Sequence, residues 1–465
     1  MTFTVAEVLE ATGGKLLQGD KGVLFQGVST DSRTVRQGEL FIALKGGRFD
    51  GHHYALEALG KEAGGILIEE KRERNFRWNG DRSKTVIAVR DTLQALGDLA
   101  RSRRRRYGPT VVGITGSNGK TTTKEMIATC LQTTFRVLKT TGNLNNLIGL
   151  PLTLLSLTEK ERVVILEMGM NVPGEIQRLT EIAEPDVGLI TNIQEVHLEG
   201  IGSLEKVATE KGELFRKMRR DGAIVVNRDD ARVVMLASEF PGQKMTYGIE
   251  GPADLMAENI RLHPKGTSFT LVSEDERSEM TLPVFGRQFV ADALAALAVS
   301  TLFGVDEKGA REALEQFKPY SMRMEVSALL GGSILINDSY NANPKSMELA
   351  LETLAELKGD GRAIAVVGDM LELGAFSEEA HLRLGKKIGE LSIDYLIALG
   401  PYGSKVVESA VRQGLNRGRA RTVQTHSEAL AVLNQILHPG DWVLVKGSRG
   451  MAMEKIAENL KEGTT

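Results

Sequence analysis

The chain has 465 residues, of which 42% are hydrophobic, and a length of this order suggests about three domains. Its formal net charge of −3 excludes a general attraction to nucleic acid or to an anionic membrane surface. No apolar stretch reaches the length of a membrane span, and the N-terminal residues lack the pattern of a signal peptide. We therefore expect a cytoplasmic protein, in which the single cysteine, Cys130, is a small buried hydrophobe.

Residues 1–107 are predicted to form a first domain. Short apolar runs at 65–68 and 86–89 alternate with helical stretches, which indicates a small α/β unit. The segment ends in the basic cluster RSRRRR at residues 101–106, followed by a Gly-Pro pair. This cluster is either a patch that binds an anion or nucleic acid, or the solvated end of a helix before a linker. We favour the second interpretation, because cations stabilise a helix C-terminus and a Gly-Pro pair ends helices.

Residues 108–316 are predicted to form a central domain. Four apolar runs alternate with helical stretches, which is typical of a parallel sheet with helices on both faces. From about residue 244 to 285 the pattern changes to short alternating runs, which predicts an antiparallel insertion. An alanine-rich helix is predicted at 292–301. The apolar runs are residues 111–114, 163–166, 187–190 and 223–226.

Residues 317–465 are predicted to form a third domain, a Rossmann-like α/β sheet with strands at 334–337, 363–367, 395–399 and 442–445. No Gly-x-Gly-x-x-Gly motif follows the first of these strands. Instead the strand leads into the polar segment DSYNANP at 338–344, which lies at the strand end where open parallel sheets bind ligands. The predicted fold class is therefore α/β with three domains.

A glycine-rich stretch, GITGSNGKTTTK at residues 113–124, lies between a predicted strand and a predicted helix. The backbone N–H groups and helix N-terminus of such a loop bind an anion, and its lysine reaches the outer phosphates. Ile114 stands where the common P-loop has a glycine, but a nucleoside triphosphate site remains the prediction, with Thr121 on Mg²⁺. The predicted loop residues are Gly116, Ser117, Asn118, Gly119, Lys120, Thr121 and Thr122.

Three residues further along the chain are candidates for the same site. Glu167 ends an apolar strand at the sheet edge that carries the loop. It is either an ordinary acid at a strand end or a Mg²⁺ ligand, and we favour the ligand because an acid that ends so apolar a strand needs a partner. His197 follows the next strand, and from the residues alone it is either a metal ligand or an ordinary histidine. Lys211 lies on a predicted helix, and the local sequence favours a surface lysine.

Eight motifs occur here in one order: GITGSNGKTTTKE, TGNLNNLIGLP, LEMGM, TNIQEVHLE, VATEKGELF, NDSYNANP, GDMLELG and VLVKGSRGM. With them the chain resembles the Mur ligases over nearly its whole length, and the loop spacing with Ile114 is the spacing of that family. The resemblance implies an ATP-dependent amide ligase. The terminal carboxylate of UDP-N-acetylmuramoyl-tripeptide would attack the γ-phosphate of ATP, and D-alanyl-D-alanine would then attack the resulting acyl phosphate.

The resemblance also implies roles for individual residues. Thr121 and Glu167 match ligands of one Mg²⁺ ion, and His197 matches a ligand of a second. Lys211 matches a lysine that is carbamylated in related Mur ligases, which reverses the interpretation as a surface residue. Lys120, His197 and Lys211 are thus the implied catalytic residues, with two Mg²⁺ ions and ATP as cofactors.

The implied substrate contacts are spread over the three domains. The UDP-muramoyl substrate would meet the first domain at Ser29, Asp31, Ser32 and Arg33, and the central domain at Asn143 and Asn146. Arg323, Asp338 and Tyr340 would close over ATP, and Asn341 and Asn343 would orient the dipeptide or the nucleotide. No contact with nucleic acid or membrane is expected, and the protein is expected to be a monomer.

Two positions depart from the family pattern. Phe289 and Asp292 stand where asparagines are usual in the segment that contacts adenine, and a carboxylate at 292 can accept a hydrogen bond but cannot donate one. Met322 stands before Arg323 where a glycine is common.

Two other functions remain to be compared with the ligase. A sibling ligase that adds the third amino acid, or a folylpolyglutamate-type ligase, is one. The sibling would carry an Asp-Asn-Pro-Arg motif, which the sequence lacks. A nucleotide-binding regulator without ligase chemistry would be expected to lose Lys120, Glu167, His197 or Lys211, and all four are present.

Overall fold

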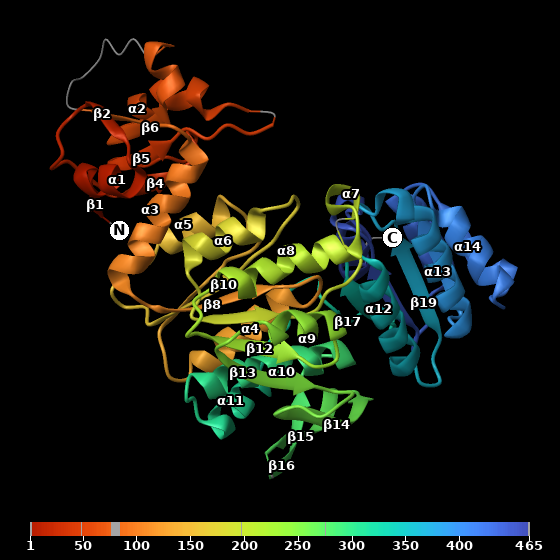
Figure 1. Ribbon diagram of the computed structural model, residues 1–465. Helices are drawn as coiled ribbons and strands as arrows, with labels where there is room; N and C mark the ends of the chain where they lie inside the picture. Colours follow the sequence, from red (N-terminus) through yellow and green to blue (C-terminus); the bar gives the residue numbers. More distant parts are fainter. Residues whose placement is uncertain (1, 48, 76–83, 197, 275, 464–465) are drawn as a thin grey trace.

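The computed structural model describes residues 2–47, 49–75, 84–196, 198–274 and 276–463. Three α/β units follow one another along the chain, each built on its own sheet (Figure 1). This is the fold class that the sequence predicts. Within the described ranges, no helix is both long enough and apolar enough to cross a membrane.

The first unit contains a five-stranded sheet in the order β2-β7-β6-β5-β4 and a two-stranded ribbon of β1 and β3. Strands β4 to β7 run parallel, and β2 joins β7 antiparallel. The strands are β1 (Phe3–Thr4), β2 (Lys15–Gln18), β3 (Leu24–Phe25), β4 (Gly27–Ser29), β5 (Glu39–Ile42), β6 (Gly65–Glu69) and β7 (Thr85–Val89). The helices are α1 (Val5–Thr12), η1 (Gly51–Tyr54), α2 (Ala55–Gly60), η2 (Glu70–Asn75) and α3 (Thr92–Tyr107).

The central unit contains a nine-stranded sheet in the order β16-β15-β14-β13-β12-β11-β8-β10-β9. The predicted parallel strands are confirmed, and β8, β10, β11 and β12 are almost wholly buried, as expected for a sheet covered on both faces. The strands are β8 (Thr110–Thr115), β9 (Val137–Lys139), β10 (Val163–Glu167), β11 (Val187–Ile190), β12 (Ala223–Asn227), β13 (Gln243–Gly248), β14 (Leu255–His263), β15 (Gly266–Ser273) and β16 (Glu276–Leu282).

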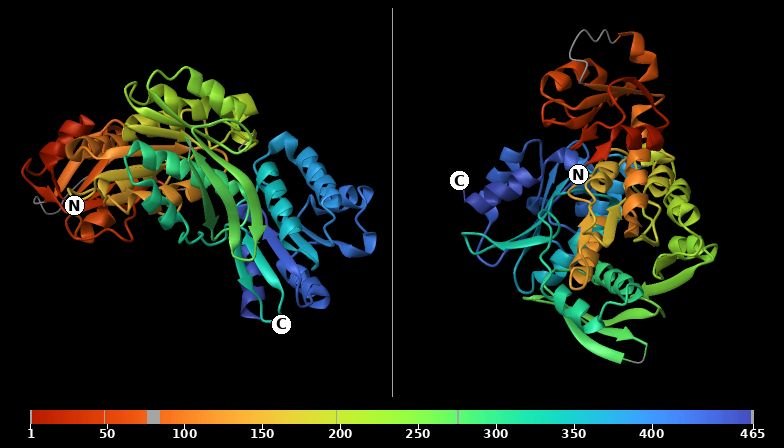
Figure 2. Two further views of the ribbon diagram at one scale, coloured as in Figure 1. Left: turned by 90° about the horizontal axis from the view of Figure 1, so that it is seen from below. Right: turned by 90° about the vertical axis from the view of Figure 1, so that its left-hand side faces the viewer.

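The predicted antiparallel insertion consists of β14, β15 and β16, which project from the sheet away from the first unit (Figures 1 and 2). Its predicted start is wrong, because β13 still runs parallel to β12. The alanine-rich helix is confirmed as α10. The helices of the unit are α4 (Lys120–Leu131), α5 (Gly149–Leu155), α6 (Glu175–Ala183), α7 (Leu198–Ile201), α8 (Leu204–Lys217), α9 (Ala231–Ser238), α10 (Arg287–Leu302) and α11 (Glu307–Leu314).

The third unit contains a six-stranded sheet in the order β17-β18-β22-β19-β20-β21, parallel except for the edge strand β17. The four predicted strands are confirmed as β18, β19, β20 and β22. The strands are β17 (Glu325–Ala328), β18 (Ile334–Asp338), β19 (Ala363–Gly368), β20 (Tyr395–Leu399), β21 (Ala420–Val423) and β22 (Trp442–Lys446). The helices are α12 (Pro344–Leu357), η3 (Gly374–Phe376), α13 (Ser377–Glu390), α14 (Gly403–Arg412), η4 (Arg417–Arg419), α15 (His426–Ile436), η5 (Arg449–Met451) and α16 (Glu454–Glu462).

The basic cluster at 101–106 lies in the last turns of α3, which ends at Gly108 in the left-handed conformation. The predicted helix end is confirmed, and Arg105 and Arg106 are exposed as expected, but the interpretation of the cluster as solvated is wrong for Arg103 and Arg104. Arg104 is buried, donates to two carbonyl groups at the end of α6, and pairs with Asp186 at 3.0 Å. Arg103 is also buried and donates to a carbonyl group that follows α5. The cluster therefore joins the first unit to the central one.

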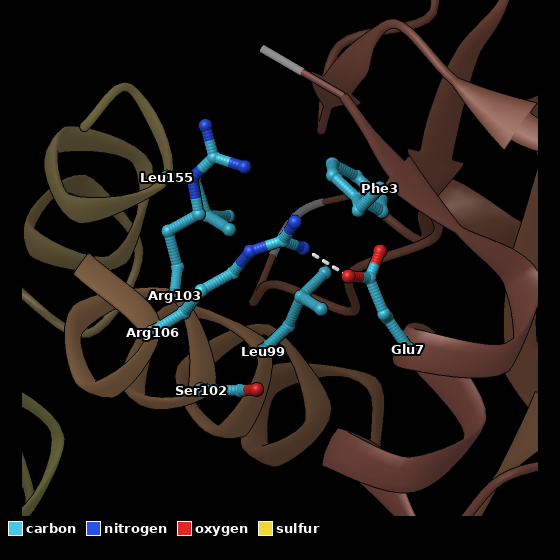
Figure 3. A pocket seen from close by; sticks show the side chains of 7 residues that line it. All are labelled: Phe3, Glu7, Leu99, Ser102, Arg103, Arg106 and Leu155. Atoms are coloured by element: carbon cyan, nitrogen blue, oxygen red, sulfur yellow. Dashed lines mark hydrogen bonds and ion pairs between the residues drawn. The ribbon is translucent and has the colours of Figure 1, made fainter. Parts of the chain in front are cut away.

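A small cavity of about 40 Å³ lies beside this junction (Figure 3). The Arg106 guanidinium faces the Glu7 carboxylate across it and forms an ion pair with it. A volume of this order holds roughly one water molecule, so the cavity is a packing gap and not a ligand site. Its lining consists of Phe3, Glu7, Leu99, Ser102, Arg103, Arg106 and Leu155.

Candidate active site

The glycine-rich loop connects the end of β8 to the start of α4, as predicted. Gly116 has a φ of 147°, and a Cβ atom there would lie 1.9 Å from Thr191 Oγ1. Gly119 has a φ of 80°, and a Cβ atom there would lie 2.5 Å from Asp292 Oδ1. Both positions require glycine, because the backbone conformation and the close neighbours exclude a side chain. The loop is thus packed tightly from beneath.

The two residues that follow β11, Thr191 and Asn192, hold the loop through hydrogen bonds. The backbone N–H of Asn118 donates to Asn192 Oδ1 at 2.9 Å, and the backbone N–H of Ser117 donates to the Asn192 carbonyl group at 2.9 Å. Thr191 Oγ1 donates to the carbonyl group of Asn118 at 2.6 Å. The sequence pointed to the segment around residues 190–197 as a strand end, but it did not single out Asn192 as a support of the loop.

Two lysines share one carbonyl group of the loop. Lys120 Nζ donates to the carbonyl oxygens of Gly116 at 2.6 Å and Ser117 at 3.2 Å, and Lys211 Nζ donates to the Gly116 oxygen at 3.0 Å. Burial lowers the pKa of Lys120, and the nearby Glu167 carboxylate opposes that shift. Burial, and then the charge of Lys120, hold the pKa of Lys211 well below its ordinary value.

Lys211 is only 2% exposed. The interpretation of Lys211 as a surface lysine, drawn from its local sequence, is therefore wrong. The helix α8 packs against β8 and turns this side chain onto the loop.

Glu167 is a buried carboxylate at the end of β10, beside Ile114 of β8. Its Oε1 accepts a hydrogen bond from Asn145 Nδ2 at 2.9 Å, whereas its buried Oε2 has no hydrogen-bond partner. An unsatisfied buried carboxylate oxygen is costly, and a hard cation would satisfy it. Asn145 lies between the two asparagines that the sequence singled out, and nothing in the sequence distinguished it from them.

The third unit reaches the loop through Arg323. Its Nη2 donates to Thr121 Oγ1 at 3.0 Å, its guanidinium carbon lies 4.1 Å from the Tyr340 ring centroid, and its Nε is buried without a hydrogen-bond partner. Met322 and Met324 on either side have φ values of 61° and 50°. A left-handed backbone explains why glycine suits position 322.

The polar segment after β18 lies at the edge predicted for it. Asp338 Oδ2 pairs with Lys446 Nζ at 2.5 Å, and Lys446 also donates to the Asn341 carbonyl group at 3.0 Å. Asn343 caps α12 and exchanges side-chain hydrogen bonds with Asn118. Of the predicted residues of this segment, Tyr340 and Asn343 thus contact the central unit or Arg323, whereas Asp338 is held within its own sheet.

Asp292 lies beneath the loop, where Thr123 Oγ1 donates to its Oδ1 at 2.8 Å. Burial raises the pKa of Asp292 to about 7. Phe289, the other departure, is part of the apolar core. The structure therefore gives Asp292 a contact with the phosphate loop, and its predicted role toward adenine stays a prediction.

The other predicted substrate residues lie elsewhere. Asp31 accepts hydrogen bonds from Arg33, which lower the pKa of Asp31 to about 2, and Ser29 Oγ donates to the Asp31 carbonyl group. Lys61 donates to the Ser32 carbonyl group. Ser29 ends β4, and Asp31, Ser32 and Arg33 lie in the loop that follows this strand, which contacts α5 of the central unit.

The two predicted asparagines lie just before α5, with Asn143 exposed and Asn146 capping the first N–H groups of the helix. His197 lies outside the described residues, so its role as a metal ligand stays a prediction. Among the described residues, no group of three or more histidines, cysteines and carboxylates is arranged to hold a metal ion.

Three family models match the chain in order. They are "Mur ligase family, catalytic domain" at residues 24–104, "Mur ligase middle domain" at 114–300 and "Mur ligase, glutamate ligase domain" at 322–449. The chain is also 36% identical to the "UDP-N-acetylmuramoyl-tripeptide--D-alanyl-D-alanine ligase" of Bacillus subtilis, over 99% of this chain and 98% of the relative. This chain belongs to the Mur ligase family. The resemblance stated from its motifs is confirmed.

Solved structures agree with this assignment. The Mur ligase described here is similar to a crystal structure of MurF from Acinetobacter baumannii, with a TM-score of 0.91, 31% identity and 99% of each chain covered. It is also similar to the MurF ligase from Thermotoga maritima in complex with ADP, with a TM-score of 0.83 and 30% identity over 94% of this chain and 97% of the other.

Proposed function

We propose that this Mur ligase joins D-alanyl-D-alanine to the terminal carboxylate of UDP-N-acetylmuramoyl-tripeptide, with ATP as the energy source. The product would be UDP-N-acetylmuramoyl-pentapeptide, a precursor of peptidoglycan, together with ADP and phosphate. One observation carries the proposal: the loop, Glu167 and Lys211 meet at one sheet edge, and Arg323 of the third unit reaches the same place. The choice of substrates is supported by full-length similarity to a relative named "UDP-N-acetylmuramoyl-tripeptide--D-alanyl-D-alanine ligase".

The chemistry begins with two anions that repel each other. A free carboxylate is a poor acyl donor and must first be activated by phosphorylation. Its oxygen attacks the γ-phosphorus of ATP, the bond to ADP breaks, and an acyl phosphate forms. The dipeptide amine then attacks the acyl carbon, loses a proton, and phosphate leaves. Lys120 and Arg323 supply positive charge for the phosphates, and the unpartnered Nε of Arg323 is a donor suited to them.

Magnesium would fit beside the loop. Glu167 has a buried carboxylate oxygen without a partner, and the Thr121 hydroxyl adds a second hard oxygen. We propose that Thr121 and Glu167 hold one Mg²⁺ ion, and that His197 and Lys211 contribute to a second. When bound, these ions would neutralise charge on the triphosphate and the acyl phosphate.

Lys211 has the features that carbamylation needs. A neutral amine attacks CO₂, a C–N bond forms and a proton leaves, so that a cation becomes an anion with two oxygens. Burial and the neighbouring Lys120 both favour the neutral amine. We therefore propose a carbamylated Lys211 as an oxygen ligand. Its negative charge would be favourable near the Lys120 ammonium group, which donates to the same Gly116 carbonyl group.

We assign the substrates to three domains with boundaries at 107/108 and 316/317. Residues 1–107 would bind the UDP-muramoyl group around Ser29, Asp31, Ser32 and Arg33, with Asn143 and Asn146 on the central side. Residues 317–465 would close on ATP through Arg323, Asp338 and Tyr340, and on the dipeptide through Asn341 and Asn343. Since the reaction consumes ATP and a nucleotide-linked precursor, we propose that the enzyme acts in the cytoplasm. We also propose that it is a monomer.

Coupled phosphate release tests the proposal. Phosphate should leave ATP only when UDP-muramoyl tripeptide and D-alanyl-D-alanine are both present, with tripeptides that carry lysine or diaminopimelate tried separately. Omission of the dipeptide should reduce the rate to background. Equal release without the dipeptide would contradict the ligase and favour a simple nucleotide hydrolase.

A further inference from the structure

Lys124 is a fully buried lysine on α4, one helical turn after Lys120. Its Nζ donates to the Thr140 carbonyl group at 2.7 Å and lies 3.1 Å from Glu125 Oε1. Lysine is almost never fully buried unless it is paired, because its ammonium group loses hydration. A buried lysine so close to the glycine-rich loop is therefore more than a packing residue.

The third neighbour of the ammonium group is Glu167. Nζ of Lys124 lies 3.7 Å from Oε2 of Glu167, the carboxylate oxygen that has no hydrogen-bond partner. At this distance the two charges attract each other, yet no hydrogen bond occupies the lone pairs of the oxygen. The other oxygen is held by Asn145. The carboxylate is thus oriented from both sides while one oxygen keeps its capacity for a cation.

Two further groups keep the lysine from moving closer to Glu167. Glu125 pairs with Lys124 through Oε1 and with the partly exposed Lys139 through Oε2. The carbonyl group of Thr140 accepts from Lys124, and the Thr140 hydroxyl accepts from the backbone N–H of Glu167. Lys124, Glu167 and Thr140, which follows β9, therefore form one buried network.

We infer that Lys124 is a positioning residue, which keeps the Glu167 carboxylate oriented for a divalent cation. The inference rests on the proposed function, in which Glu167 is a Mg²⁺ ligand. The effect expected of Lys124 on metal binding is the opposite of what its charge alone would produce. Removing a cation near a metal site should strengthen metal binding if charge alone mattered, whereas loss of a positioning residue should weaken it.

Manganese binding provides a direct test, because Mn²⁺ replaces Mg²⁺ and is seen by electron paramagnetic resonance. Full-length protein with saturating ADP would be titrated with Mn²⁺, and ADP affinity would be measured separately in EDTA. Lys124→Met should weaken Mn²⁺ binding about tenfold, the size typical of residues that orient metal ligands. The ADP affinity in EDTA should stay within about twofold, because a metal-free nucleotide does not depend on Glu167.

Lys139→Met is the matched control. Lys139 pairs with the same Glu125, yet its ion pair is with Glu125 and not with Glu167, so its loss should leave Mn²⁺ affinity within about twofold. Should Lys124→Met fail to fold, the double variant Lys124→Met, Glu125→Gln removes the buried cation together with its partner charge, and the same weakening of Mn²⁺ binding is expected.

Unchanged or tighter Mn²⁺ binding in a folded Lys124 variant would overturn the inference. So would an equal loss of ADP affinity in EDTA, which would show a general structural role. A wild-type protein that binds no Mn²⁺ in the presence of ADP would contradict the proposed function itself.

Discussion

Asn118 of the phosphate loop and Asn343 at the start of α12 exchange two side-chain hydrogen bonds, at 2.6 Å and 3.2 Å, across 225 positions of sequence. Asn343 also caps α12 by accepting a hydrogen bond from the backbone N–H of Ser346. The pair ties the loop of the central unit to the third unit, beside the contact of Arg323 with Thr121. Both contacts therefore depend on where the third unit lies relative to the loop.

Asn343→Ser separates the two roles of Asn343. Serine keeps a good helix cap but is too short to reach Asn118, so the melting temperature should change by no more than about 2 °C. We expect kcat/KM for phosphate release to fall about tenfold, since two hydrogen bonds that align the units are lost. Wild-type kcat/KM in the stable variant would show that the pair has no part in catalysis.

Lys211→Ala should nearly abolish phosphate release, because it removes the proposed oxygen ligand and leaves a cavity beside the loop. Short carboxylates such as formate or acetate should restore part of the rate by occupying the place of the carbamate. Lys206→Ala, on the exposed side of the same helix, is the control and should behave as wild type. Full activity of Lys211→Ala without added carboxylate would remove this residue from the metal site.

Asp292 gives a prediction for pH dependence. Its pKa is about 7 in the folded protein against 3.8 for an ordinary aspartate, so between about pH 4 and pH 7 the folded state binds more protons than the unfolded chain. The contribution of Asp292 to stability therefore falls as the pH rises through that range, by about 4 kcal/mol at most.

Asp292→Asn should remove this dependence while the amide oxygen still accepts from Thr123. In thermal unfolding without nucleotide, the variant should be more stable than wild type near pH 8, and this advantage should be much smaller near pH 5. A difference between the two proteins that does not vary with pH would mean that Asp292 titrates at an ordinary value.

The junction between the first two units depends on Arg104. Arg104→Met would leave two carbonyl groups at the end of α6 without this donor and would remove the shorter of the two ion pairs of Asp186, the other being with Arg219. We expect the free energy of unfolding to fall by about 3 kcal/mol, measured with urea. Arg106→Met, at the exposed ion pair with Glu7, should cost less than about 1 kcal/mol. Equal losses would indicate that burial at position 104 has no special weight.

The central strands could be predicted because parallel strands buried on both faces are continuous apolar runs. The edge strands β9, β17 and β21 are short and partly exposed, so they carry no such signal. The glycine-rich loop could also be predicted, because the residues that indicate phosphate binding lie within ten consecutive positions.

The buried polar residues of the site were harder to predict. Lys124 and Lys211 lie on helices whose local sequences suit a solvated face, and only packing against β8, β9 and β10 buries them. Asn145 and Asn192 act through contacts with residues 22 to 74 positions away, which a reading of one segment cannot reveal.

The order of the central sheet has a consequence for folding. Strand β8 lies between β10 and β11, which both follow it in the chain, and the loop after β8 takes its hydrogen bonds from Asn192 and, much later, from Asn343. Contacts between such distant segments form slowly. During synthesis or refolding the helices should therefore form well before the protein can bind a nucleotide. Throughout that interval the glycine-rich loop lacks the hydrogen bonds from Asn192 and Asn343 that hold it in the folded protein.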